Sequence, residues 1–128
     1  MESLLFEATD RTPKVSFDTA TLTFEMDGES RPENVREFFD SILSFLDKLL
    51  KEVSGSGKTI TVNMKLIYFN SSSAKYMLNI AKKFREFIDG GVNVVFNWHY
   101  ETDDEDMKDT GSEMERMSKV PFVFIEIN

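Results

Sequence analysis

The segment at positions 68–73, Tyr-Phe-Asn-Ser-Ser-Ser, carries three adjacent hydroxyl groups and a carboxamide. An alternating strand pattern precedes it and an amphipathic helix pattern follows, and open α/β sheets usually present functional groups at such a strand-to-helix turn. One hydroxyl could accept a phosphate, because a helix N-terminus tolerates the charge of about −1.5 to −2 that a phosphate carries at pH 7. That charge would block an exposed binding face by repulsion and desolvation, so the turn predicts a switch.

The same turn also has a purely structural interpretation. Ser71 or Ser72 would cap the helix by accepting a hydrogen bond from a backbone N–H, while Asn70 shapes the turn. The chain would then be a structural subunit, and replacing Ser71 with Ala would cost about 1 kcal/mol of stability and nothing else.

His99 and the acidic run at positions 103–106 are the other groups that could do chemistry. A small hydrolase would need an activated Ser and a buried Asp beside His99, and the carboxylates of the run suit Mg²⁺ or Ca²⁺ in a metal-dependent enzyme. The run lacks the spacing and the central Gly of an EF-hand, whereas acidic residues before a helix commonly cap it and complement its dipole. We favour that structural interpretation, and a structural or partner-facing role for His99.

The composition limits the class of protein. The chain has 128 residues, of which 41% are hydrophobic, and it contains twelve Phe, one His and no Cys. This length can bury one core, so we predict a single domain over residues 1–128. The lack of Cys excludes disulfides and thiolate zinc sites, and one His cannot build a multi-histidine zinc site. We therefore expect no cofactor and no enzymatic activity.

Charge and hydropathy indicate the compartment and the kind of partner. No apolar run approaches the roughly 20 residues that cross a bilayer, and the start of the chain lacks the basic and apolar regions of a secretory signal. A cytoplasmic location is the expectation. The formal net charge of −8 makes nucleic acid and anionic membranes unfavourable partners, because their binding normally depends on clustered Lys and Arg. We expect protein partners.

The elements that must position the turn follow from hydrophobic periodicity. The first part of the chain predicts a β-hairpin or meander, with Asp27-Gly28 ending the third strand as a turn. Spacings of three and four predict helices after Pro32, from the three serines at positions 71–73 (the serine segment), and, more weakly, through Met107, Met114 and Met117. The predicted strands are residues 4–6, 15–18, 22–26, 58–69, 92–100 and 122–127, and the predicted helices are residues 35–53, 71–89 and 107–117.

Strands that alternate with helices after a β-rich start indicate an α/β fold. Crossover helices of this length join parallel strands, so we predict a single mixed, largely parallel sheet with about three packed helices. Tyr68 is expected on the same face of its strand as Ile60. The strand order stays open.

The turn motif resembles that of the SiaC family of bacterial regulatory phosphoproteins, in which a strand ends in Tyr-(Leu/Phe)-Asn-(Thr/Ser)-Ser-Ser before a helix. The resemblance covers nearly the whole chain in order. It also includes Thr12-Pro13, Arg31-Pro32-Glu33-Asn34, Trp98-His99-Tyr100 with its acidic continuation, and Pro121-Phe122.

The resemblance implies a STAS-like fold and a partner-switching protein in biofilm and cyclic-di-GMP regulation. A serine/threonine kinase would phosphorylate it, a PP2C-type phosphatase would restore it, and the unmodified form would bind a diguanylate cyclase. The modified position maps onto Ser71, where the family pattern carries Thr, and Ser72 and Ser73 stay open as acceptors. The implied partner-binding residues are Tyr68, Asn70, Ser72, Ser73 and Lys75.

Overall fold

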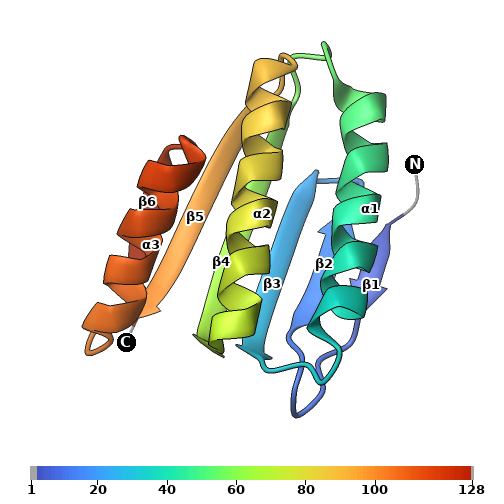
Figure 1. Ribbon diagram of the computed structural model, residues 1–128. Helices are drawn as coiled ribbons and strands as arrows, with labels where there is room; N and C mark the ends of the chain where they lie inside the picture. The colour runs from blue at the N-terminus through green and yellow to red at the C-terminus, as the bar shows by residue number, and fades with distance from the viewer. Residues whose placement is uncertain (1–2, 128) are drawn as a thin grey trace.

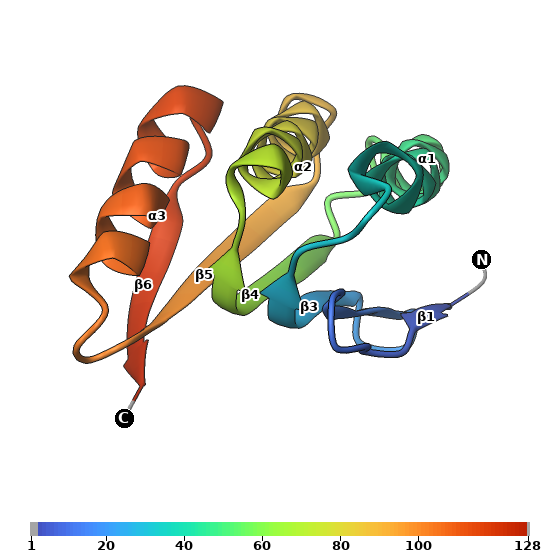
Figure 2. The same cartoon turned by 60° about the horizontal axis from the view of Figure 1, so that its bottom comes forward.

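A computed structural model describes residues 3–127 as a six-stranded sheet with three helices on one of its faces (Figure 1 and Figure 2). The strands are β1 (Leu4–Phe6), β2 (Lys14–Asp18), β3 (Thr23–Ser30), β4 (Thr59–Phe69), β5 (Asn93–Glu101) and β6 (Phe122–Ile127). The helices are α1 (Val35–Val53), α2 (Ser71–Asp89) and α3 (Glu105–Ser118). The predicted mixed, largely parallel α/β sheet with an opening hairpin is confirmed.

The strands follow one another across the sheet in chain order, from β1 to β6. The first three strands pair antiparallel, and β3 to β6 pair parallel. Each parallel connection passes through one helix to the adjacent strand in the same direction, and such crossovers are almost always right-handed. Successive crossovers of one hand therefore place α1, α2 and α3 on the same face, as Figure 2 shows.

The core lies between the helices and the side chains of alternate strand residues. Phe24, Phe84 and Phe96 are fully buried and pack at ring-centroid distances of 5.7 and 5.9 Å. The opposite face of the sheet carries polar pairs, including Lys65–Glu25 at 3.3 Å. One covered face and one open face account for the clean alternation in the sequence.

A bulge on β4 changes which side chains face the core near the end of that strand. In the pairing with β3, Gly28 lies opposite Leu66 and Glu29 lies opposite Tyr68, so Ile67 is an extra residue. An extra residue shifts the alternation of the side chains by one position. Consistently, Ile67 and Tyr68 are both exposed.

The prediction that Tyr68 shares a face with the buried Ile60 is therefore wrong. Tyr68 is 43% exposed, and the guanidinium carbon of Arg31 lies 4.6 Å from the centroid of its ring. Phe69 instead faces the core, where it packs edge-on against Trp98 at a centroid distance of 6.5 Å. The bulge thus turns the Tyr68 ring outward three residues before Ser71.

The prediction that Asp27-Gly28 ends the third strand is also wrong. The strand continues to Ser30, because Gly28 adopts a φ of 122° that keeps the chain in the sheet beside the bulge. A Cβ at Gly28 would lie 3.5 Å from the Cα of Pro13.

The third helix differs from its predicted pattern at one position. Met107 and Met114 are buried, but Met117 is 43% exposed.

None of the helices within residues 3–127 is long and apolar enough to span a membrane. The predicted domain, residues 1–128, includes positions 1, 2 and 128, which lie outside the described residues, and the count of one domain stays a prediction.

Candidate functional site

The serine segment begins α2 directly after the last residue of β4 and Asn70. Asn70 is the N-cap, because its side-chain oxygen accepts a hydrogen bond of 2.9 Å from the backbone N–H of Ser73. Its own backbone N–H donates to the carbonyl oxygen of Ser30 at 3.1 Å. The structural interpretation that Ser71 or Ser72 caps the helix is therefore wrong, because Asn70 already occupies the cap position and caps as well as Ser does.

The three serine hydroxyls lie on different sides of α2, because successive residues of a helix are rotated by about 100°. Ser73 faces the sheet and is fully buried. Its Oγ lies 2.9 Å from the Oγ of Ser30 and donates to the Ser30 carbonyl oxygen at 3.3 Å. Ser73, which the motif leaves open as acceptor and partner contact, therefore reaches neither a kinase nor a partner without local unfolding.

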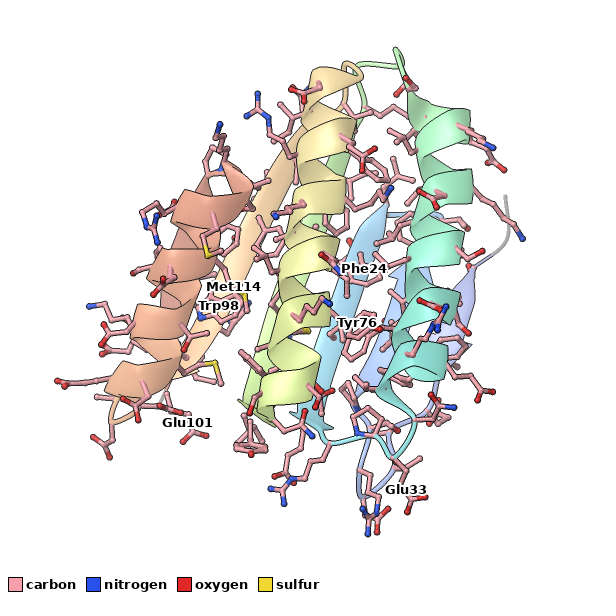
Figure 3. All side chains as sticks on the ribbon, viewed as in Figure 1. Phe24, Glu33, Tyr76, Trp98, Glu101 and Met114 are labelled. Atoms are coloured by element: carbon pink, nitrogen blue, oxygen red, sulfur yellow. The ribbon has the colours of Figure 1, made fainter. Side chains whose placement is uncertain are left out.

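Ser72 is exposed and belongs to the side of α2 that faces α1. Tyr76, one turn after Ser72, stacks on Phe39 of α1 with a centroid distance of 5.3 Å and an interplanar angle of 10°. Figure 3 shows Tyr76 between the two helices. A group attached to Ser72 would therefore lie near α1.

Ser71 is exposed and belongs to the side of α2 that faces α3. Lys75 and Leu78, four and seven residues later, lie on the same side of the helix, and both line a groove of about 330 Å³ between α2 and α3. Met114 borders this groove from α3, and Figure 3 shows this residue between α3 and α2. A phosphate on Ser71 would therefore lie near the α3 side.

The charged groups around the turn are solvent-accessible. Arg31 covers the Tyr68 ring and pairs with Glu29 at 2.7 Å. Lys75 is exposed and has no hydrogen-bond or ion-pair partner within residues 3–127. The predicted contact residues Tyr68, Ser72 and Lys75 are thus exposed, whereas Asn70 is half-buried and engaged in the cap.

His99 lies on the open face of the sheet, away from the serine segment. Partial burial lowers its pKa, and the Lys65 ammonium adds to this effect, while Glu25 and Asp27 oppose it. Its Nε2 atom is buried and has no hydrogen-bond partner in the described part of the chain. The structure brings no activated Ser and no Asp into hydrogen-bond contact with this ring among those residues.

The acidic run contains the N-terminus of α3. Asp104 is the N-cap, and its side chain accepts a hydrogen bond of 3.0 Å from the backbone N–H of Met107. Glu105 and Asp106 lie in the first turn, where they complement the helix dipole. Among residues 3–127, no group of three or more His, Asp or Glu side chains is placed to hold a metal ion. The helix-start interpretation of this run is confirmed.

Sequence reasoning missed the residues that support the turn from neighbouring elements. Ser30 anchors both Asn70 and Ser73, but no local pattern shows which strand pairs with β4. Arg31 belongs to the Arg-Pro-Glu-Asn segment that resembles the family, although nothing in the sequence places it over Tyr68.

Comparisons with known proteins agree with the motif. A sequence model described as "SiaC family regulatory phosphoprotein" matches residues 6–127. An uncharacterized protein of Pseudomonas aeruginosa (strain UCBPP-PA14) is 28% identical over 122 residues, 95% of this chain and 94% of that protein. The crystal structure of apo-SiaC from P. aeruginosa has a TM-score of 0.84 and 27% identity, over 98% of this chain and 99% of the other.

A further similar structure contains a partner. It is the crystal structure of the diguanylate cyclase SiaD in complex with its activator SiaC from P. aeruginosa. The matched chain has a TM-score of 0.85 and 27% identity, with coverage of 97% of this chain and 99% of that chain.

Proposed function

The chain belongs to the SiaC family of regulatory phosphoproteins, and from that premise we propose that it is a non-enzymatic partner-switching protein of the cytoplasm. Its unmodified form binds and regulates a diguanylate cyclase. The complex of the similar P. aeruginosa protein with the cyclase SiaD supports this choice of partner. The net charge of −8 supports a protein partner rather than nucleic acid.

The proposed switch is reversible phosphorylation of Ser71. A serine/threonine kinase transfers the γ-phosphoryl group of ATP to Oγ of Ser71, with release of ADP and of the hydroxyl proton. A PP2C-type phosphatase hydrolyses the phosphoester and returns the hydroxyl. The observation that carries this proposal is the difference between the serines, because Ser73 is buried while Ser71 is exposed at the first helical position of α2.

Ser71 is preferred over Ser72 because of the sides of α2 on which they lie. Ser71 precedes the exposed Lys75 and the groove beside α3, whereas Ser72 precedes Tyr76, which is packed on α1. A new double charge at Ser71 would therefore change an open surface. Tyr68 and Lys75 flank it as the proposed partner contacts.

Mass spectrometry of the protein isolated from its native cells tests the proposed modification. Intact mass and peptide mapping should show a fraction with one phosphate, located on Ser71. Ser71→Ala should abolish this mass shift, and Ser72→Ala should retain it. A phosphate on Ser72 alone, or none under any growth condition, would contradict the proposal.

A further inference from the structure

The groove between α2 and α3 lies on the helical side of the molecule and has a largely apolar lining. Ala74 and Leu78 of α2 and Met114 and Met117 of α3 contribute its apolar surface. We propose that this α2–α3 groove binds an amphipathic helix of the protein partner, and that acidic residues of that helix pair with Lys75 and Lys82. This inference rests on the proposed function and specifies the surface that the switch controls.

The groove has the composition of a helix-binding site. Met117 is 43% exposed, and it is the only large hydrophobic residue of α1, α2 and α3 that is exposed to this degree in the described part of the chain. Two methionines adjust their flexible side chains to an incoming apolar surface. Amphipathic helices bind such grooves through apolar residues at spacings of three, four and seven.

Two lysines of α2 without ion-pair partners among the described residues indicate that the helix bound in the groove carries acidic residues. Lys75 and Lys82 are exposed, seven residues apart on one side of the helix, and neither has a hydrogen-bond or ion-pair partner within residues 3–127. By contrast, Lys83 on the same helix pairs with Asp47 at 2.6 Å and Glu86 at 2.8 Å.

On the opposite edge, Glu113 is the acidic residue among those that line the groove. Glu113 pairs with Arg116 at 3.1 Å. Among the residues that line the groove, the charged group without an ion-pair partner in the described part of the chain is therefore the Lys75 ammonium, although the chain as a whole has a net charge of −8. Lys75 and Lys82 lie about 10 Å apart along the axis, since a helix rises about 1.5 Å per residue. This separation of the two lysines along the axis equals that of two acidic residues two turns apart on a partner helix.

The same geometry connects the groove with the switch. Lys75 follows Ser71 by four residues, so a phosphate on Ser71 can pair with Lys75 within α2. Lys75 is then no longer available to the carboxylates of the partner helix. The remaining negative charge of the phosphate repels those carboxylates. Ser72 lies on the α1 side and lacks this relationship to the groove.

Binding measurements with a purified diguanylate cyclase that the wild-type protein binds test the inference. Met117→Glu and Lys75→Glu should each weaken binding by about tenfold or more, because buried interface anchors and charge pairs commonly contribute at least that much. The matched control is Val123→Glu, which introduces the same side chain as both variants, and the same charge change as Met117→Glu, at a 51% exposed apolar residue of the open sheet face. Its affinity should stay within about twofold of wild type. Circular dichroism and thermal melting verify the fold of each variant.

The outcomes separate this inference from the proposed function. Folded Met117→Glu and Lys75→Glu proteins that bind the cyclase like wild type would overturn the groove and leave the function intact. If the wild-type protein binds no diguanylate cyclase, the proposed function fails and the inference fails with it. Concentration-dependent dimers that Met117→Glu abolishes would show that a second copy covers the groove, which also overturns the inference.

A photo-crosslinker at Leu78 provides a second measurement that does not depend on affinity. The crosslinked cyclase peptide should come from a helical segment with Asp or Glu residues seven apart. A peptide from a strand or from a basic segment would contradict the proposed occupant.

Discussion

The hydroxyl oxygens of Ser30 and Ser73 lie 2.9 Å apart in the interior and join the end of β3 to the first turn of α2. Their contact assigns Ser73 to the support of the turn and leaves Ser71 and Ser72 at the surface.

Ser73→Ala should lower the free energy of unfolding by about 1–3 kcal/mol, because it leaves the buried hydroxyl of Ser30 without this partner. Ser71→Ala should change it by less than about 0.5 kcal/mol, as at most exposed sites. Urea denaturation measures both. The double variant Ser30→Ala/Ser73→Ala should lose less than the sum of the single losses, and equal losses for Ser71→Ala and Ser73→Ala would contradict the assignment.

Asn70→Ala should destabilise the protein by about 1 kcal/mol, because the backbone N–H of Ser73 loses its acceptor at the helix start. Asn70→Asp is the matched control, since a carboxylate also accepts this hydrogen bond and suits the helix N-terminus. Thermal or chemical denaturation compares the two variants. If Asn70→Ala were as stable as wild type and Ser71→Ala were destabilised, Ser71 and not Asn70 would be the N-cap.

Gly111→Ala should displace α3 from the sheet. A Cβ at this position would lie 2.5 Å from the Trp98 Nε1 atom, which donates a hydrogen bond of 3.0 Å to the carbonyl oxygen of Met107. We expect a loss of about 1–3 kcal/mol from overpacking, with a change in the fluorescence of the single Trp. The exposed Ser112→Ala variant is the control, and unchanged stability and fluorescence for Gly111→Ala would contradict the packing described.

His99 should make the stability depend on pH. Burial lowers its pKa in the folded protein, so the unfolded chain binds the proton more tightly, and stability falls as pH drops below the unfolded value of about 6.5. The loss is complete once the pH is below the folded pKa. His99→Gln should reduce the decline in melting temperature between about pH 7 and pH 5. An identical decline in both proteins would contradict this effect.

The sequence predicted the long elements well, because α1, α2 and β4 repeat their apolar residues over many positions. It could not predict the bulge at Ile67, which arises from the pairing of β4 with β3. For that reason the predicted orientation of the Tyr68 side chain was wrong, although the predicted strand was correct. Periodicity within one strand carries no information about an extra residue relative to its neighbour.

The candidate site was predictable in position but not in detail. The motif locates the turn, but Asn and Ser cap helices about equally well, so the cap depends on where β4 ends. The groove could not be predicted from the sequence, because Leu78 and Met117 belong to different helices and only the packing of α2 against α3 brings them together.

The most direct test of the switch is the affinity of a diguanylate cyclase for the unmodified protein and for proteins with phosphoserine incorporated at position 71 or 72. Isothermal titration calorimetry should show tight binding of the unmodified protein and of the protein phosphorylated at Ser72, with binding lost on phosphorylation at Ser71. Equal affinity of the unmodified and Ser71-phosphorylated proteins would contradict the proposed switch.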